Sequence, residues 1–318
     1  MPASIKLLTH SITTRKIYQR TPGGSWSEFP VQPPIVASVG TVLVGLPNGS
    51  IIVWDGWSQV FWHWNPATET WINRGSPGTA TAWNTGVAVG EDSAVVVCAG
   101  HVAAFDGSTN TWTYLGAHGG SDDVAAFSLT DIWTCGRSAN VNYVWHYDGA
   151  NWVNYHPITP ELLLDGYHNI PQSVAIAGGA VFFILSSAVW WPPGVGSTVT
   201  RFYNGNWAMS GNILLQLSNI WVLDPETFFF NCNMGGTGPG AWRQFKGSDA
   251  EDGGTNNLSF TSTEQQNMDV QVNTCIKGIV GLNAQQIYVA GAWAAPRVWE
   301  TLNGGATWAL TTGYPSDN

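Results

Sequence analysis

The chain has few charged residues, and basic residues are the scarcest of them. Of its 318 residues, 11 are Lys or Arg and 21 are Asp or Glu, so the formal net charge is −10. Charged residues make up 10% of the chain, against about 25% in an average soluble domain. Because nucleic-acid affinity rests on Lys and Arg that neutralise phosphates, this balance argues against DNA or RNA as a partner.

Long hydrophobic runs are also missing. No stretch approaches the roughly 20 apolar residues that a membrane span needs, and residues 1–16 lack the continuous apolar core of a secretion signal. We therefore expect no membrane insertion and see no secretion signal. No long segment has a 3.6-residue apolar period either, so helices should be few.

Cysteine is scarce and widely spaced. The four cysteines form no CxxC pair, so the sequence indicates neither a zinc site nor a disulfide framework. We expect buried free thiols, which pack as small hydrophobic groups, and no cofactor. The four residues are Cys98, Cys135, Cys232 and Cys275.

Tryptophan, in contrast, is abundant, with 19 residues. Six of them follow a tight turn, and most successive pairs are about 40–55 residues apart, a spacing typical of propeller blades. A longer interval before the last copy leaves room for one more unit, for which Trp242 is the candidate. We expect the six to pack between repeats: Trp26, Trp71, Trp112, Trp152, Trp207 and Trp308.

Each repeat also predicts several short strands. Residues 128–156 contain three apolar runs, and Asp148-Gly149 stands between the last two as a hairpin turn. A small-residue strand precedes each such group. Radial repetition of four-stranded units leaves only short sheet edges, so we predict an all-β fold, a β-propeller.

The predicted propeller is a single domain, 1–318, of seven blades with mostly four antiparallel strands. Its first blade would be incomplete, with three strands. A β-solenoid or tandem sandwiches are the alternatives, and their repeat lengths or connections fit less well. The expected blades are residues 1–30, 34–75, 80–117, 121–157, 165–210, 213–262 and 270–313.

Two motifs carry a resemblance to known families. The pattern D-I-W-x-x-G followed by V-W-H-Y-D-G-x-x-W, residues 131–152, resembles repeats of bacterial and phage-borne propellers similar to the photosystem II assembly-factor and sialidase-type families. Residues 301–308 resemble the Asp-box S-x-D-x-G-x-T-W, with Thr301 in place of Ser and Asn303 in place of Asp. The resemblance implies a propeller fold and specifies no activity.

A binding site is expected on the loops between second and third strands. We predict that these loops are long, at residues 47–58, 187–197, 224–239 and 291–296, and that they also carry Phe228 to Phe230. Loops on a rigid scaffold commonly carry recognition. Exposed Trp rings would stack on sugar rings. Alternatively, they cover the loops' own small cores or bind a neighbouring protein subunit. The predicted ligand-binding residues are Trp57, Trp190, Trp191 and Trp293.

Catalytic residues are not expected. A sialidase needs clustered arginines, whereas the seven in this chain are scattered. Other glycosidases need two carboxylates across the scissile bond, and the available ones form no recognisable signature. A glycan-cleaving enzyme of sialidase-like architecture remains the alternative. The carboxylates considered are Asp122, Asp123, Asp165, Glu226, Asp249 and Glu251.

No metal site is expected. His63 and His146 occupy equivalent positions in their repeats, which favours packed or surface residues over metal ligands. Residues 248–254 form an acidic run that would suit Ca²⁺, although a solvated loop explains it as well.

These observations favour a non-enzymatic binding or structural module displayed outside a cell or on a virus particle, such as a decoration or fibre-type protein. A surface rich in Trp, Gly and Thr and poor in charge is consistent with that location. The expected partner is a glycan or another protein subunit.

Overall fold

The structure is a computed structural model. It describes residues 7–10, 16–35, 42–78, 83, 85–98, 100–139, 141–155, 170–186, 197–210, 216–225, 227–233, 241–248, 257–267, 275–292, 297–304 and 307–313. The chain divides into two compact units, residues 1–154 with 312–318, and residues 155–311.

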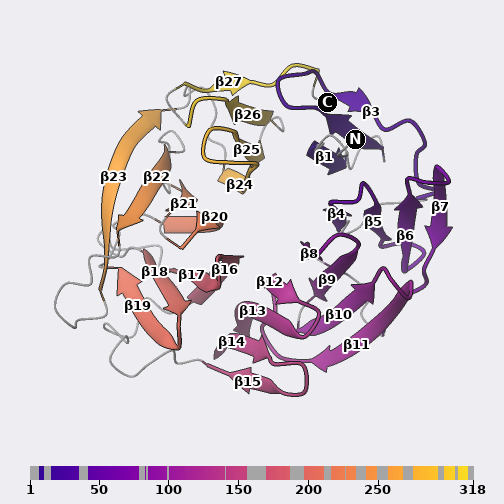
Figure 1. Ribbon diagram of the computed structural model, residues 1–318, viewed down its shortest axis with the longest axis horizontal. Helices are drawn as coiled ribbons and strands as arrows, with labels where there is room; N and C mark the ends of the chain where they lie inside the picture. Colours follow the sequence, from indigo (N-terminus) through magenta and orange to yellow (C-terminus); the bar gives the residue numbers. More distant parts are fainter. Residues whose placement is uncertain are drawn as a thin grey trace. The chain divides into compact units, whose positions relative to one another are not determined.

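The first unit consists of antiparallel sheets in which neighbouring strands follow one another along the chain (Figure 1). Its sheets are β1 (Leu7–His10), β2 (Ile17–Arg20) and β3 (Ser27–Glu28); β4 (Leu43–Gly45), β5 (Ile51–Asp55), β6 (Val60–Asn65) and β7 (Thr70–Asn73); β8 (Thr85–Val89), β9 (Ser93–Cys98), β10 (His101–Asp106) and β11 (Thr111–Ala117); and β12 (Asp123–Ser128), β13 (Asp131–Ser138), β14 (Val141–Tyr147) and β15 (Trp152–Asn154). The three strands predicted for the incomplete first blade are confirmed.

The second unit holds one eight-stranded and one four-stranded sheet. The larger sheet contains β16 (Ile170–Ala177), β17 (Ala180–Ser186), β18 (Ser197–Tyr203), β19 (Asn206–Ser210), β20 (Gln216–Asp224), β21 (Thr227–Asn233), β22 (Ala241–Ser248) and β23 (Asn257–Asn267). The smaller contains β24 (Cys275–Gly281), β25 (Ile287–Ala292), β26 (Arg297–Thr301) and β27 (Ala309–Leu310). In the parts of the chain described, no helix is long and apolar enough to cross a membrane.

The prediction of seven blades is wrong, because the strands form six sheets. Two groups of four, β16–β19 and β20–β23, were expected to be separate blades. Parallel pairing of β19 with β23, at Met209 with Asn257 and Ser210 with Leu258, joins them into one sheet. The two halves still bury apolar side chains against each other, among them Phe182 and Phe228. Each half has four strands, as predicted, and only the pairing of β19 with β23 lowers the count.

Apolar runs form the middle strands of the sheets. β9, with the sequence SAVVVC, is buried along its whole length, as a strand covered on both faces should be. The last strand of the same sheet, β11, alternates between exposed and half-buried positions. Cys98 and Cys135 are both buried, as predicted.

Asn or Asp side chains organise the turns between third and fourth strands. Oδ1 of Asn65 accepts a hydrogen bond from the Ala67 amide over 2.9 Å. Asp106 and Asp148 accept equivalent bonds from the amides two residues later, each over 2.9 Å. Such side chains replace a backbone partner in tight turns, so the repeated turn signal in the sequence has a local physical cause.

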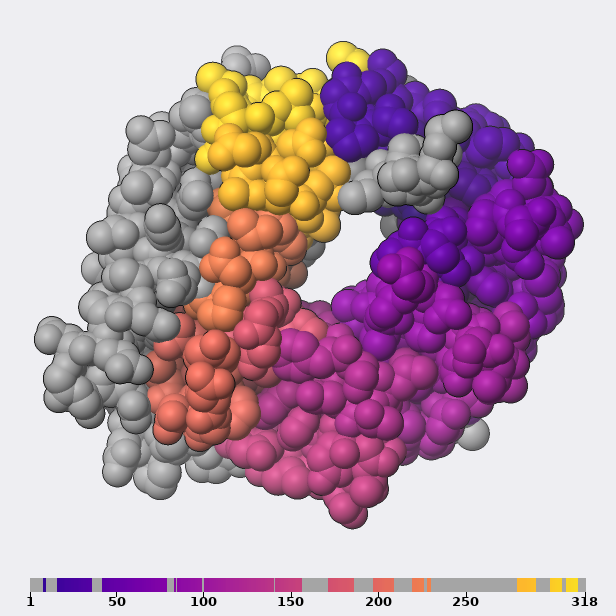
Figure 2. Space-filling view, viewed as in Figure 1, coloured from indigo at the N-terminus to yellow at the C-terminus, as the bar shows by residue number. Residues whose placement is uncertain are grey.

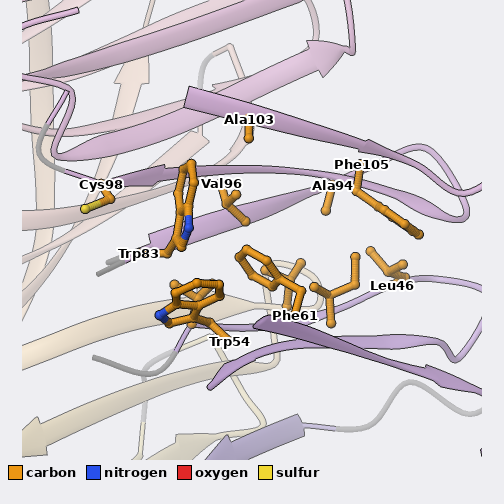
Figure 3. Packing of buried hydrophobic residues seen from close by; sticks show 12 residues of the cluster. Leu46, Trp54, Phe61, Trp83, Ala94, Val96, Cys98, Ala103 and Phe105 are labelled. Carbon is orange, nitrogen blue, oxygen red and sulfur yellow. The ribbon is translucent and has the colours of Figure 1, made fainter. Parts of the chain in front are cut away.

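The cores of the first unit lie between neighbouring sheets. Trp54 and Phe61, from one sheet, face Trp83 and the next sheet in a wholly buried cluster (Figure 3). The ring centroids of Trp54 and Phe61 lie 4.8 Å apart. In the space-filling view, the sheets of this unit pack closely from indigo to magenta (Figure 2).

The repeated Trp residues take part in these cores, as predicted. Trp112, on β11, packs 4.4 Å from the ring of Phe61 in the preceding sheet, measured between centroids. Trp71 and Trp152 also donate their indole N–H groups to carbonyls of the preceding segment, Val31 over 2.7 Å and Leu115 over 3.0 Å. The side chain of Trp242 lies outside the described residues.

Candidate binding face of the first unit

Trp57 is the most exposed large apolar side chain among the described residues, with 69% of its surface accessible. It lies in the turn 56–59 between β5 and β6. Asp55, fully buried at the end of β5, accepts a hydrogen bond from the Trp57 amide over 3.1 Å. Its other oxygen accepts from the Ser58 hydroxyl, and Gln59 adopts a left-handed φ of 54°. The buried Asp55 carboxylate therefore holds the turn in place, and the Trp57 indole is exposed to solvent.

Of the four predicted ligand-binding residues, the structure describes one, Trp57. Trp57 lies where it was expected, on a turn between second and third strands. Trp190, Trp191 and Trp293 lie outside the described residues. The sequence therefore predicted a cluster of which the structure describes one member.

Two of the predicted long loops are wrong. β5 occupies residues 51–55, so the first loop shrinks to the turn 56–59. In the second unit, β20 ends at Asp224 and β21 begins at Thr227, which leaves a tight turn. Phe228 and Phe229 belong to β21 and are 1% and 0% exposed, because a run of aromatic residues is more stable in a covered strand than in a loop.

Turns of the first unit gather at two ends of its sheets. In the β8–β11 sheet, the turn after the first strand lies next to the turn after the third, since the Gly107 amide donates to Ser93 Oγ over 3.2 Å. The turns after the first strands of two neighbouring sheets also meet, since the Asn48 amide donates to the Glu91 carbonyl over 3.0 Å. Turns after second strands lie with the connections between sheets, and the His118 amide donates to the Gly100 carbonyl over 2.5 Å. We name the end with the turns after first and third strands the acidic face, and the end with the turns after second strands, which include the Trp57 turn, the Trp57 face.

The acidic face carries carboxylates from every sheet between β4 and β15. No Lys or Arg stands in the turns of this face that the structure describes, residues 46–50, 66–69, 90–92, 107–110, 129–130 and 148–151. An anionic partner would be repelled by the carboxylates of this face. The carboxylates in or beside these turns are Glu69, Glu91, Asp92, Asp106, Asp131 and Asp148.

A second aromatic group on the Trp57 face was not predicted from the sequence. Tyr143 and Trp145, on β14, have nearly parallel rings with centroids 5.9 Å apart. The Trp145 indole donates to the Gly119 carbonyl over 3.1 Å. At Gly120, with φ of +76°, an added Cβ would lie 2.5 Å from the Tyr143 ring. Glycine thus lets the ring lie against the backbone, and the Gly-Gly pair was the available sequence signal.

His118 lies beside these rings. Its centroid is 5.2 Å from that of Trp145 and 4.5 Å from that of Trp152. Burial lowers the pKa of His118 below its ordinary value, partly opposed by a hydrogen bond with the Leu115 backbone. The imidazole therefore favours its neutral form and acts as a packing group between two sheets.

Two of the carboxylates considered for glycoside cleavage lie in the described part of the chain, Asp122 and Asp123. Asp122 accepts a hydrogen bond from the Arg137 amide over 3.1 Å, which commits one oxygen to the backbone. Asp123 begins β12 and accepts from the Val124 amide over 3.0 Å. The remaining carboxylates that were considered lie outside the described residues: Asp165, Glu226, Asp249 and Glu251.

Metal-binding groups are likewise not assembled in the described part of the chain, where no three His, Cys, Asp or Glu residues could hold an ion. His63 accepts from the Arg74 guanidinium, and a cation beside the ring opposes metal binding. His146 stacks on Trp133 with centroids 4.1 Å apart and lies 3.0 Å from Asp131. The acidic run at 248–254 lies outside the described residues except for Ser248, whose side chain is not described.

No protein-family model and no curated protein matches this chain. Solved structures do resemble it. The structure of YCF48 bound to D1 peptide matches with a TM-score of 0.63 at 11% identity, over 95% of this chain and 89% of that one. YCF48 from Cyanidioschyzon merolae matches with 0.57 at 13% identity, over 87% of each chain.

A third match is catalytically inactive virginiamycin B lyase from Staphylococcus aureus with quinupristin, with a TM-score of 0.61 at 11% identity, over 89% of this chain and 90% of that one. At such low identities the likeness concerns the fold and no shared activity. These neighbours are β-propellers. We conclude that the chain is an all-β propeller, with six blades instead of the predicted seven.

Proposed function

We propose that the protein is a non-enzymatic binding module that holds another protein through its Trp57 face. The observation that carries this proposal is the exposed indole of Trp57 above the fully buried carboxylate of Asp55. A rigid aromatic side chain loses little conformational entropy on binding, so Trp is over-represented among residues that dominate interface energies.

The surroundings of Trp57 support recognition over chemistry. On the Trp57 face, the Trp57 turn is held by hydrogen bonds to Asp55, and Asp122 accepts one from the Arg137 amide. One of the solved propellers binds a peptide, which makes a protein the first partner to test. We further propose that the module is displayed outside a cell or on a virus particle. Its low content of charged residues, 10%, supports that location.

A glycan is the second candidate ligand. The flat exposed face of Trp57 suits the C–H side of a sugar ring, and Ser58 and Gln59 beside it offer hydrogen-bonding groups. If Trp190, Trp191 and Trp293 contribute, their substitution to Ala will weaken the same binding as Trp57→Ala.

The experiment compares wild type, Trp57→Ala and Val31→Ala in cross-linking to proteins of the producing cells or particles and on a glycan array. Val31 is a matched control, since it is apolar and 41% exposed. We expect one or more specific cross-linked proteins, lost about tenfold or more in Trp57→Ala and kept in Val31→Ala.

The alternative outcomes are distinct. Array binding that needs Trp57, without a cross-linked protein, would replace the protein by a glycan. Release of a new reducing end from an array glycan would contradict the non-enzymatic assignment. Equal behaviour of the Trp57 and Val31 variants would remove Trp57 from the binding face.

A further inference from the structure

Three Asn-Gly pairs lie at turns of the chain: Asn48-Gly49, Asn204-Gly205 and Asn303-Gly304. In each pair the glycine has a left-handed φ, of 87°, 78° and 67° in that order. Asn followed by glycine is prone to deamidation, because no glycine side chain hinders the attack of its amide nitrogen on the Asn side chain. By sequence the three pairs are equivalent, whereas the structure gives their reacting groups different hydrogen bonds.

Asn48 is held within its own turn. Its Oδ1 accepts a hydrogen bond from the Ser50 amide over 2.8 Å. The Gly49 amide, which would be the attacking group, donates to the Leu46 carbonyl over 2.9 Å. Attack of the Gly49 nitrogen on Cγ of Asn48 therefore requires that both hydrogen bonds break.

Asn303 is held by more hydrogen bonds. Its Oδ1 accepts from the Thr307 amide and from the Thr301 hydroxyl, each over 2.9 Å, and its Nδ2 donates to the Thr307 hydroxyl over 2.8 Å. The Gly304 amide donates to the Gln285 carbonyl over 3.0 Å. The side chain and the neighbouring amide are both fixed, so the same reaction is suppressed here.

Asn204 lies in the turn between β18 and β19 and differs on each of these points. Asn204 and Gly205 are both exposed, and an added Cβ at Gly205 would meet no atom within 4 Å. Neither the Asn204 side chain nor the Gly205 amide forms a hydrogen bond with another described residue. The two groups can therefore rotate toward each other without breaking such a bond.

The peptide group between Asn204 and Gly205 has one hydrogen bond that favours the reaction. Nδ2 of Asn206 donates to the Asn204 carbonyl oxygen over 3.2 Å. When the Gly205 amide loses its proton, the negative charge is shared between its nitrogen and this oxygen. A donor placed where charge develops lowers the barrier, so Asn206 stabilises the form of the amide that attacks.

We propose that Asn204 is a site of spontaneous deamidation, with water as the co-reactant. The deprotonated Gly205 nitrogen bonds to Cγ of Asn204 and closes a succinimide ring. The Cγ–Nδ2 bond breaks, and Nδ2 takes up a proton from water and leaves as ammonia. Water then opens one of the two ring carbonyls, which leaves aspartate or isoaspartate at position 204.

The product changes the hairpin of β18 and β19. Either form adds one negative charge. Isoaspartate also adds a methylene group to the main chain of a turn that has two residues between the paired Tyr203 and Asn206. Because β19 pairs with β23 and so joins the two halves of the eight-stranded sheet, we expect isoaspartate to loosen that junction.

The test measures the deamidated fraction at the three Asn positions by mass spectrometry of peptides from the full chain, after the folded protein has been incubated in mildly alkaline buffer. We expect Asn204 to react at least about tenfold faster than Asn48 or Asn303, since the need to break two hydrogen bonds slows each of these. The control is the same chain unfolded in urea, where the three rates should be similar. Equal rates in the folded chain, or a slower rate at Asn204 than at Asn48 or Asn303, would overturn the proposal.

Asn206→Ala tests the role of the side-chain donor. We expect it to slow deamidation at Asn204 about threefold in the folded chain and to leave the rate in urea unchanged. If the substitution only loosened the turn, the folded rate would rise instead, which would contradict the positioning role of Asn206. Asn204 belongs to the second unit and Trp57 to the first, so neither result bears on the proposed function.

Discussion

The guanidinium of Arg74 donates to Nδ1 of His63, at 3.4 Å from Nε and 3.2 Å from Nη2. The same Nη2 donates to Oδ1 of Asn110, in the next sheet, over 2.5 Å. Because Nδ1 accepts, the imidazole is neutral with its proton on Nε2, a buried atom without a partner. Arg74 thus links two sheets through a histidine that must stay uncharged.

This arrangement predicts that the protein loses stability in mild acid. Burial and, next, the Arg74 charge lower the pKa of His63 from its ordinary 6.5 to about 4. The unfolded chain therefore binds a proton at higher pH than the folded one, so stability falls as pH drops from 6.5 toward 4. The full shift corresponds to about 3 kcal/mol. Urea unfolding at pH 7 and at pH 4.5 measures the loss.

His63→Gln supplies the control, since the amide can accept from Arg74 without titrating. We expect this variant to lose less stability than wild type between the two pH values. His118, whose pKa burial also lowers, remains in both proteins and contributes in the same direction. Equal pH dependence of the two would contradict the role of His63.

The indole N–H groups of the repeated Trp residues predict an asymmetric pair of substitutions. Trp152 donates to the Leu115 carbonyl over 3.0 Å, whereas Nε1 of Trp112 is buried without a partner. Trp152→Phe leaves a carbonyl with one partner fewer and should cost about 1 kcal/mol more than Trp112→Phe, for the same loss of volume. Guanidinium unfolding of both variants tests this. A larger loss for Trp112→Phe would show that its N–H has a partner such as a buried water.

The buried carboxylate of Asp55 is predicted to hold the Trp57 turn. Asp55→Ala removes the acceptor of the Trp57 amide and the Ser58 hydroxyl and should cost about 1–3 kcal/mol. Loosening should also expose the turn to chymotrypsin, with a new cut after Trp57 detected by mass spectrometry. Asp148→Ala, in an exposed turn of the acidic face, is the comparison and should cost less. No change in cleavage at Trp57 would separate the turn's order from Asp55.

The glycine beside Tyr143 gives a steric prediction. Gly120→Ala would place a Cβ 2.5 Å from the Tyr143 ring and 3.1 Å from backbone atoms of Gly136 and Arg137. Gly90→Ala meets no atom within 4 Å at a similar φ of +60°, so it reports backbone strain alone, about 1 kcal/mol. We expect Gly120→Ala to cost clearly more in thermal and chemical unfolding. Equal losses would show that the aromatic ring moves freely.

Local features were predictable from the sequence. The turn residues Asn65, Asp106 and Asp148 act within three positions of themselves, so their role is visible in a short window. The repeated Trp residues follow these turns, and they pack against the neighbouring sheet. The all-β propeller fold follows from this repetition of turns and short apolar runs, and Cys98 is buried because it ends one such run, β9.

Contacts between distant segments were not predictable in this way. The chain's sequence determined the strands, the tight turns and the packing role of the repeated Trp residues, because each depends on neighbours along the chain. Only the tertiary structure decided that β19 pairs with β23, that Phe228 is covered rather than displayed, and that Tyr143 lies on Gly120. These outcomes depend on which segments meet in space, and a pairing of edges or a close approach to a glycine leaves no fixed spacing in the sequence.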